Sequence, residues 1–580
     1  MSLASLDSNV QANINQWLNG NYDDESKQYI RQLIEEEKYT ELTDSFYKDL
    51  EFGTGGIRGI MGVGSNRINK YTLGMATQGL SNYLLQLYPG KQVKVAIAHD
   101  CRNDSDTFAR LVAEVFSANG IYVYFFNGLR PTPELSFAIR ELGCQSGVMI
   151  TASHNPKEYN GYKAYGEDGG QLTEPHDINV MAEVEKITSV DEIKFNPQED
   201  KIETIGKEID EKYLAALLKL SISRDAIKRQ HDLPIVFSPI HGTGGVMVPP
   251  ALKLFGFTNV HLVEEQMVVD GNFPTVIYPN PEEKEALNMA INLAKEIGAE
   301  LVMATDPDAD RVGIAVRDND GEFILLNGNQ TAALLINYVM TAWEESGKLT
   351  GKEYVIKTIV TSYLIDKMAE SKGIECFNTL TGFKWIGKIM TELEGKKTFL
   401  AGGEESYGLL VGEHARDKDA VVSCAMIAEM AAFYKDQGRS IYDALLDIYV
   451  EYGCYKEKLI SITKKGKSGA EEIAALMDKY RKDPPLALGG SRVVTIMDYE
   501  SSTARHLADD STEPIDLPGS NVLQFFTDDG SIISARPSGT EPKIKFYCSV
   551  KAPLHDKGQF PIVEQELDTK LDSIMRDLGV

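Results

Sequence analysis

The sequence has few of the residues that build disulfide frameworks and zinc sites. Only six cysteines are spread over 580 residues, and no two of them form a C-x-x-C pair. This usage suits a reducing compartment and argues against structural zinc. We therefore expect small buried apolar side chains at the six positions, which are Cys101, Cys144, Cys376, Cys424, Cys454 and Cys548.

Long apolar runs and an excess of positive charge are also absent. No run approaches the roughly 18 apolar residues of a membrane span, and the first residues, MSLASLDSNVQANINQWL, lack the basic start and apolar stretch of a signal peptide. Lys and Arg number 59 against 86 Asp and Glu, and the net charge of -27 repels nucleic-acid phosphates and anionic membranes. We expect a cytoplasmic protein that binds neither. The sequence gives no indication of the oligomeric state.

What the chain does contain is a globular composition, with 43% hydrophobic residues and a length that fits roughly three to five domains. From about residue 91, short apolar runs alternate with amphipathic stretches, which is typical of βα units around a largely parallel sheet. A helix with apolar residues at helical spacing is expected to end at Gly298. Strands are expected in three blocks, at 93–100, 121–129 and 146–156, then 233–245, 259–265 and 299–311, then 354–362, 373–378 and 397–408.

The last block has a different pattern. Consecutive apolar runs from 491 to 550, with Asp529-Gly530 as a hairpin turn, predict an antiparallel sheet, and a helix with one apolar face follows at 563–578. The fold class expected is therefore α/β, with three similar mixed α/β domains and a C-terminal α+β domain. The first 45 residues are expected to form helices. Linkers are expected near 190–210, 315–325 and 460–490, where Lys, Asp, Gly and Pro cluster.

The motif DPDADR places three carboxylates, Asp306, Asp308 and Asp310, directly after an apolar run. Such crowding of negative charge is tolerated mainly when a cation neutralises it, and oxygen ligands without Cys or His favour magnesium over zinc or copper. An EF-hand is excluded because Arg311 stands where its glycine is needed. The alternatives are an acidic surface turn and an aspartyl phosphotransferase in which Asp306 is the nucleophile.

The motif TASHNP places Ser153 and His154 at the end of another apolar run. Ligands bind at the carboxyl ends of strands in parallel α/β sheets, so this position favours a functional loop over a simple turn. A serine hydroxyl is a weak nucleophile until a neighbouring cation, base or metal activates it. Lys163 and His154 are the candidates to do so.

Four further segments can contact anions or sugars. RPSGTEP offers Arg536, Ser538, Gly539 and Thr540 as a phosphate cradle, and GTGGIRG offers glycine amides with Arg58. GEESYG offers Glu404 and Ser406 to sugar hydroxyls, and TGFKW offers Lys384 to a phosphate. Each has an ordinary loop as its alternative. Several cationic spots in an acidic chain are consistent with a phosphorylated substrate that is attracted locally.

With these motifs in their order, the chain resembles the phosphohexomutase family and, within it, the longer branch of phosphoglucomutases. The resemblance runs from GTGGIRG to RPSGTEPKIKFY. It implies four domains around a central cleft, which we place at 1–205 with the serine loop, 206–325 with the metal loop, 326–460 with the sugar loop and 461–580 with the phosphate loop.

The resemblance also implies roles for single residues. Ser153 would carry the phosphoryl group, and magnesium would be held by Asp306, Asp308 and Asp310 together with the Ser153 group. Catalytic roles would fall to Ser153, His154, Lys163 and Arg58. Substrate contacts would fall to Arg311, Thr381, Gly382, Lys384, Glu404, Ser406, His414, Lys418, Arg536, Ser538, Gly539 and Thr540.

The activity implied is interconversion of glucose 1-phosphate and glucose 6-phosphate through a bisphosphate, with Mg²⁺ as cofactor and glucose 1,6-bisphosphate as activator. Mannose or pentose phosphates remain alternative substrates, because relatives in this branch act on them. A sugar phosphatase that uses Asp306, and a sugar-phosphate sensor without turnover, are the rival classes.

Overall fold

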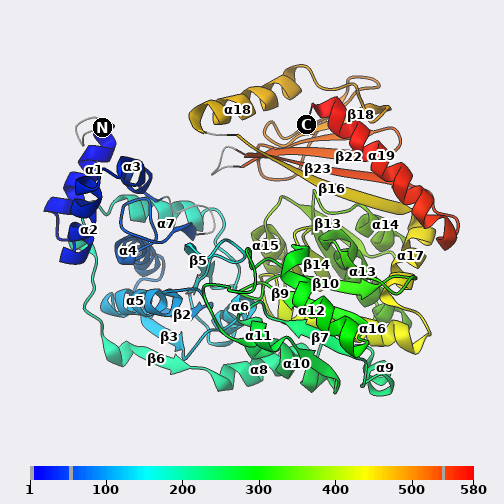
Figure 1. Ribbon diagram of the computed structural model, residues 1–580, viewed down its shortest axis with the longest axis horizontal. Helices are drawn as coiled ribbons and strands as arrows, with labels where there is room; N and C mark the ends of the chain where they lie inside the picture. The colour runs from blue at the N-terminus through cyan, green and yellow to red at the C-terminus, as the bar shows by residue number, and fades with distance from the viewer. Residues whose placement is uncertain (1–5, 51–55, 465, 539–542, 580) are drawn as a thin grey trace. The chain divides into compact units, whose positions relative to one another are not determined.

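The computed structural model describes residues 6–50, 56–464, 466–538 and 543–579 (Figure 1). Within helix α18 (Gly466–Lys482) it describes the side chains from Ser468 on. The chain forms two compact units. Unit one contains residues 1–327, 383–401 and 406–436, and unit two contains residues 328–382, 402–405 and 437–580. Among the helices of the described residues, none combines the length and the apolar character needed to cross a membrane.

Three helices precede the first sheet, as the sequence predicts. Trp17 stacks on Tyr22 with ring centroids 4.2 Å apart, and the edges of Phe46 and Tyr71 close around it. This aromatic cluster attaches the helices to α4 of the first sheet layer, because Tyr71 belongs to α4. The helices are α1 (Ser8–Asn19), α2 (Asp24–Glu35) and α3 (Tyr39–Phe46).

The first sheet has the order β1-β5-β4-β2-β3-β6. The middle strands pair in parallel as predicted, whereas β5 runs antiparallel to both β4 and β1. Its strands are β1 (Gly56–Ile60), β2 (Lys94–His99), β3 (Tyr122–Phe126), β4 (Ser146–Ile150), β5 (Tyr159–Gly166) and β6 (Ile202–Ile205). Its helices are α4 (Lys70–Leu87), α5 (Ser105–Ala118), α6 (Thr132–Glu141) and α7 (His176–Glu185).

The second sheet, also in unit one, has the order β11-β10-β9-β7-β8. The predicted crossover helix is confirmed: it ends before Gly298, whose φ of 72° suits a residue without a side chain. The strands are β7 (Ile235–Ser238), β8 (Val260–Leu262), β9 (Leu301–Thr305), β10 (Val312–Arg317) and β11 (Phe323–Leu326). The helices are α8 (Lys207–Leu218), α9 (Arg224–Arg229), α10 (Gly244–Phe255), α11 (Glu264–Met267) and α12 (Lys284–Ile297).

A third sheet has the order β13-β12-β14-β15, with β12 and β13 parallel. Its strands are β12 (Glu353–Thr358), β13 (Glu375–Thr379), β14 (Thr398–Gly403) and β15 (Leu409–Val411). The helices of this region are α13 (Gly328–Glu345), α14 (Leu364–Ser371), α15 (Phe383–Leu393), α16 (Ala420–Asp436) and α17 (Ile441–Tyr452). All three predicted blocks therefore form α/β layers.

The C-terminal sheet in unit two is antiparallel, as predicted, with the order β16-β23-β22-β21-β18-β19-β20 and β17 beside β18. Gly530 turns the β21–β22 hairpin with a φ of 82°. The strands are β16 (Cys454–Thr463), β17 (Ala487–Leu488), β18 (Ser491–Asp498), β19 (Thr503–His506), β20 (Thr512–Pro514), β21 (Leu523–Thr527), β22 (Ile532–Pro537) and β23 (Lys543–Ala552).

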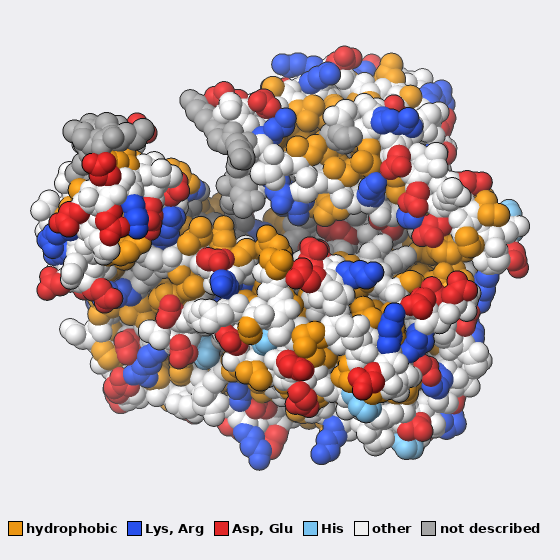
Figure 2. Space-filling view, in the orientation of Figure 1, with side chains coloured by type: hydrophobic (Ala, Val, Ile, Leu, Met, Phe, Trp, Pro, Cys, Tyr) orange, Lys and Arg blue, Asp and Glu red, His pale blue; other side chains and the backbone are white. Residues whose placement is uncertain are grey.

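Helix α19 (Phe560–Leu578) lies along this sheet, and its predicted apolar face is buried (Figure 1). The buried residues include Val563, Leu567, Leu571, Ile574 and Leu578. Helix α18 (Gly466–Lys482) joins β16 to the following strands. In Figure 2, acidic side chains are scattered over the visible face of each unit and are interspersed with basic ones. All six cysteines are free thiols, and Cys376 alone among them is only half-buried.

All three segments expected as linkers contain regular secondary structure. Residues 190–210 contain β6, which pairs with β3, and residues 315–325 span paired parts of β10 and β11 and the turn between them. Residues 460–490 contain α18. Edge strands, hairpin tips and exposed helices carry the same polar residues as linkers, so composition alone did not separate them. The four-domain division stays a prediction, and its boundaries at 325 and 460 fall inside β11 and β16.

Candidate active site

Two of the predicted functional loops connect strands that pair antiparallel within an α/β sheet. The TASHNP loop joins β4 to β5, and the DPDADR loop joins β9 to β10. The GEESYG loop likewise joins β14 to β15 in the third sheet. Each loop therefore turns sharply at the carboxyl end of a strand, where α/β sheets bind ligands.

Each of these loops also contains a non-glycine residue in the left-handed region. The φ angles are 52° at Ser153, 50° at Ala309 and 65° at Tyr407. Such a conformation costs on the order of 1 kcal/mol or more and persists only where surrounding contacts over-determine it. The contacts around Ser153 and Ala309 are therefore the ones that shape the site.

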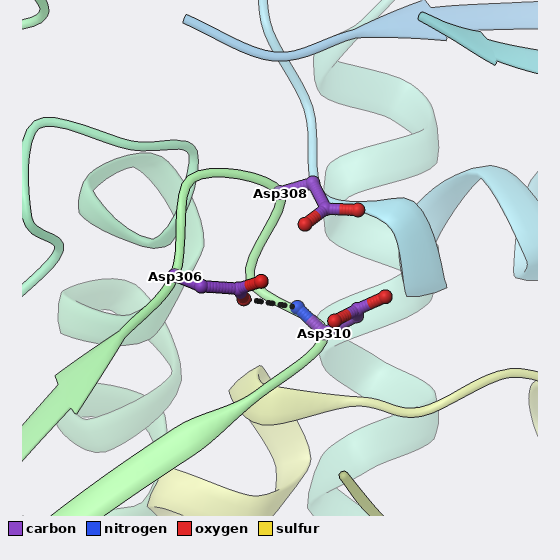
Figure 3. Close-up of side chains that lie close together, drawn as sticks. All are labelled: Asp306, Asp308 and Asp310. Carbon is purple, nitrogen blue, oxygen red and sulfur yellow. Dashed lines mark hydrogen bonds between the residues drawn. The ribbon is translucent and has the colours of Figure 1, made fainter. Parts of the chain in front are cut away.

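The three aspartates of DPDADR converge, as Figure 3 shows. Each offers a carboxylate oxygen within 4.8 Å of the others, and all three side chains are buried. The backbone N–H groups of Asp310 and Arg311 both donate to Asp306 Oδ1, at 3.1 and 3.0 Å (Figure 3 draws the first). The loop thus holds Asp306 rigidly against its own backbone.

Ser153 lies against this cluster. Its hydroxyl donates to Asp306 Oδ2 at 2.8 Å and lies 3.2 Å from His154 Nδ1. Burial lowers the pKa of His154 well below its ordinary value, and the charges of Arg311 and Arg58 lower it further. His154 is therefore a neutral neighbour of the serine. The structure brings together two residues 153 positions apart that sequence analysis had placed in separate loops.

Two lysines neutralise part of the carboxylate charge. Lys163 Nζ donates to Asp308 Oδ2 at 2.7 Å and to Asp310 Oδ2 at 3.0 Å, and Lys418 Nζ lies 3.2 Å from Asp310 Oδ2. Burial opposes the charge on Lys163, but the two aspartates outweigh it and raise its pKa. Lys163 therefore stays protonated and acts as a fixed cation. Burial likewise opposes the charge on Asp310, but the lysines hold its pKa below the ordinary value.

The donor set fits a hard divalent cation. Asp308 Oδ1 and Asp310 Oδ1 are buried without a hydrogen-bond partner among the described residues, which is costly unless an ion or water binds them. Burial and then the charges of Asp308 and Asp310 raise the pKa of Asp306, so its charged form is disfavoured here and a bound cation would stabilise it. Carboxylate oxygens without nitrogen or sulfur ligands suit Mg²⁺.

Arg311 and Arg58 flank the cluster. Arg311 Nη1 donates to the Ser406 carbonyl at 2.9 Å and lies 3.3 Å from Glu282 Oε1. Arg311 therefore links the DPDADR loop to Ser406 of the GEESYG loop. Arg58 Nη1 donates to Asn155 Oδ1 at 2.8 Å, beside the serine. The glycines before Arg58 at 53–55 lie outside the described residues.

Glu404, Gly382 and Lys384, also predicted as substrate contacts, have partners outside the serine–aspartate cluster. Glu404 Oε1 accepts a hydrogen bond from the Gly382 N–H at 2.9 Å. Both residues belong to unit two, as does Thr381, the residue before Gly382. Lys384 in unit one lies 3.7 Å from Asp177 Oδ2. Burial lowers the pKa of Lys384.

His414 is not part of the serine–aspartate cluster. Its Nε2 lies 2.7 Å from Asp419 Oδ2, which also accepts from the Tyr213 hydroxyl at 2.7 Å. Neighbouring Lys418 instead reaches Asp310 and Asp417. His414 and Lys418, both predicted as substrate contacts, therefore have different partners.

The predicted phosphate loop is only partly described. Arg536 and Ser538 lie at the end of β22 and just after it, half-buried, and the Ser538 N–H donates to the Lys543 carbonyl at 2.7 Å. Gly539 and Thr540 lie outside the described residues.

Sequence analysis missed three residues that support this site. Thr132, at the start of α6, donates to Asp308 Oδ2 at 2.7 Å, and its N–H donates to the Asp308 carbonyl at 2.9 Å. Asp100 and Arg102 surround the serine loop. The signal was present, because HDCRND follows the apolar run of β2 just as the three recognised motifs follow theirs.

Glu134, two positions beyond Thr132 on α6, is a fully buried carboxyl. Arg130 Nε lies 3.9 Å from its Oε1. Burial raises the pKa of Glu134 well above the ordinary value of 4.5, and the neighbouring carboxylate of Asp210 raises it further. Glu134 is therefore held in its neutral form in the folded protein.

We expect Glu134→Gln to raise the thermal midpoint at pH 8. When the pKa of a carboxyl is higher in the folded than in the unfolded protein, its contribution to stability is complete below the unfolded-state pKa. That contribution is lost as the pH rises through the folded-state pKa. Glutamine has no proton to lose, so the variant avoids this loss. The advantage of the variant should shrink toward zero near pH 4. Thermal unfolding from pH 4 to 8 measures it, with exposed Glu211→Gln on α8 as the control. An advantage that does not grow with pH would contradict this assignment.

The fold and the site, a serine hydroxyl beside a buried carboxylate triad, are compatible with an α/β enzyme of the phosphoryl-transfer class. Family models for the phosphoglucomutase/phosphomannomutase α/β/α domains I, II and III match residues 49–191, 211–321 and 327–452. The chain therefore belongs to the phosphoglucomutase/phosphomannomutase family.

Individual relatives agree. The phosphoglucomutase of Staphylococcus haemolyticus is 36% identical over 91% of this chain and 95% of its own length. That of Staphylococcus aureus USA300 is 38% identical over 91% and 94%. Among solved structures, the Paramecium phosphoglucomutase pp63/parafusin has a TM-score of 0.66 at 19% identity, covering 92% of this chain and 96% of its own. A Burkholderia thailandensis family protein has a TM-score of 0.64 at 18% identity, covering 91% and 97%. These two likenesses concern the fold alone.

Proposed function

We propose that the chain interconverts glucose 1-phosphate and glucose 6-phosphate through a phosphoserine at Ser153. The observation that carries this proposal is the 2.8 Å contact between the Ser153 hydroxyl and Asp306 Oδ2, inside a buried carboxylate triad. The substrate follows from the relatives, because phosphoglucomutases 36 to 38% identical over 91% of the chain cover the same residues.

The cycle has two phosphoryl transfers. In the first, the bond between Ser153 Oγ and phosphorus breaks while the 6-hydroxyl oxygen of glucose 1-phosphate bonds to phosphorus, and the hydroxyl proton passes on to Ser153 Oγ. The product is glucose 1,6-bisphosphate. After the bisphosphate reverses in the site, Ser153 Oγ bonds to the phosphorus on O1 while the bond between O1 and that phosphorus breaks. The serine proton passes to O1, and glucose 6-phosphate leaves. Electrostatic stabilisation and positioning supply most of the acceleration in such transfers.

Different residues of this chain would stabilise charge, move the proton and exclude water. Lys163 and Lys418 are fixed cations that oppose the carboxylate charge and stabilise negative charge on the transferring group. Arg58, near the Ser153 loop, and His154, which is neutral, are the groups placed to stabilise charge or receive the hydroxyl proton. The buried position of Ser153 excludes water, which would otherwise hydrolyse the phosphoserine.

Asp306, Asp308 and Asp310, with an oxygen of the Ser153 group, would hold Mg²⁺. When bound, the ion would polarise the phosphoryl oxygens and neutralise their charge. Glucose 1,6-bisphosphate would act as activator, because it reloads Ser153 whenever the intermediate escapes. The proposed substrate contacts are Arg311, Thr381, Gly382, Lys384, Glu404, Ser406, His414, Lys418, Arg536, Ser538, Gly539 and Thr540.

A coupled assay tests this function. We expect rapid conversion of glucose 1-phosphate to glucose 6-phosphate with Mg²⁺ and a trace of glucose 1,6-bisphosphate, and at least tenfold lower kcat/KM with mannose 1-phosphate and ribose 1-phosphate. A preference for mannose or ribose phosphate would overturn the substrate and keep the mechanism. Release of free phosphate without isomerisation would overturn the mutase itself.

A further inference from the structure

Arg102 is a buried arginine whose guanidinium faces the backbone after Ser153. It is 3% exposed. Its Nη1 donates to the carbonyls of Pro156 and Tyr159, at 2.8 and 3.0 Å. Its Nη2 donates to the carbonyls of Ser153 and Asn155, both at 2.5 Å. One planar group thus fixes four carbonyls of a seven-residue segment that contains the serine, and only a guanidinium has enough donors in a fixed plane for this.

The turn after β2, which contains Asp100 and Arg102, also holds the residues before Ser153. Asp100 Oδ2 lies 3.4 Å from Arg102 Nε and accepts from the Thr151 hydroxyl at 2.6 Å. Thr151 Oγ1 in turn accepts from the Ser153 N–H at 2.8 Å. Hydrogen bonds that start from Asp100 and Arg102 therefore hold the chain on both sides of Ser153.

The second sheet layer, in the same unit, holds Arg102 in place. The ring of buried Phe273 lies 5.2 Å from the guanidinium carbon, within the range of a cation–π contact. Gly271 packs so closely on this turn that a Cβ there would lie 2.3 Å from the Asn103 nitrogen and 2.8 Å from the Arg102 carbonyl carbon. The orientation of Arg102 is thus set by contacts from both layers.

We propose that Arg102 is a positioning residue that holds Ser153 in its left-handed conformation and so aims Oγ at the aspartate triad. The φ of 52° at Ser153 is unfavourable by itself, and its carbonyl is one of those that Arg102 binds. A misplacement of about 1 Å at a reacting atom costs about 100-fold in rate. The predicted effect on turnover rests on the proposed function, but the effect on the loop does not.

Arg102→Lys is the decisive variant, because lysine keeps the charge but cannot reach four carbonyls in one plane. We expect kcat to fall about 100-fold while KM changes less than about threefold. We also expect faster deuterium exchange of the backbone amides of residues 153–160. Arg229→Lys, at an exposed arginine paired with Asp436, is the matched control and should leave both measurements unchanged.

Arg102→Ala with added guanidinium separates positioning from general folding. Millimolar guanidinium should restore at least about tenfold of the lost kcat in Arg102→Ala and should leave the wild type unchanged. Wild-type kcat and wild-type exchange in Arg102→Lys would overturn the proposal. So would a loss of kcat in Arg102→Ala that guanidinium does not restore. An inactive wild type would refute the proposed function, and the exchange measurement would still decide the role of Arg102.

Discussion

Ser153→Ala is expected to abolish mutase turnover, lowering kcat by about 10,000-fold or more, because alanine has no oxygen to carry the phosphoryl group. The fold should survive, since the hydroxyl makes one hydrogen bond to Asp306 and a second close contact to His154. The loss of such hydrogen bonds costs on the order of 1 kcal/mol each. The coupled assay and a thermal unfolding curve measure the two effects.

Ser146→Ala is the matched control for this prediction. Ser146 is equally buried, lies on β4 before the same loop, and donates to the Tyr165 carbonyl at 2.7 Å. It should keep turnover within about threefold of the wild type. Substantial turnover in Ser153→Ala would exclude the phosphoserine and would favour Asp306 as the nucleophile.

Removal of Mg²⁺ is expected to lower kcat by about 1,000-fold or more, because the ion supplies several kcal/mol of charge stabilisation. Chelation followed by dialysis and readdition of Mg²⁺ measures this directly. Asp308→Asn should act in the same direction, since it removes the charge of a carboxylate whose Oδ1 has no partner among the described residues.

Asp320→Asn is the matched control for Asp308→Asn. Asp320→Asn changes an exposed aspartate in the β10–β11 turn, a short distance along the chain, and should bind Mg²⁺ and turn over as the wild type does. Full activity after exhaustive chelation, or Mg²⁺ binding by Asp308→Asn equal to that of the wild type, would contradict a metal at the triad.

The fold was predictable where local pattern decides it. Buried strands such as β2, β4 and β9 carry uninterrupted apolar runs, and α19 carries its apolar face at helical spacing. The antiparallel position of β5 was not predictable, because it depends on pairing with β4 rather than on its own residues. The hairpin over residues 315–325 was not predicted for the same reason.

The sequence predicted which loops form the candidate site, but not which of their side chains contact one another. The strand-end position selected Ser153 and the three aspartates, but the pairing of Lys163 with Asp308 and Asp310 joins residues about 145 positions apart. Arg102 was missed although its turn follows the apolar run of β2, because a strand-end position does not show which residue of the turn acts. Its role depends on carbonyls that face it only in the folded chain.

The central claim is that Ser153 carries the phosphoryl group that becomes part of the product. The most direct measurement loads the protein with labelled phosphate from glucose 1,6-bisphosphate, maps the label by peptide mass, and then adds unlabelled glucose 1-phosphate. We expect one label on the peptide containing Ser153 and its complete transfer to sugar phosphate within the time of a few turnovers. A label on an aspartate, or label that leaves only as free phosphate, would contradict the account.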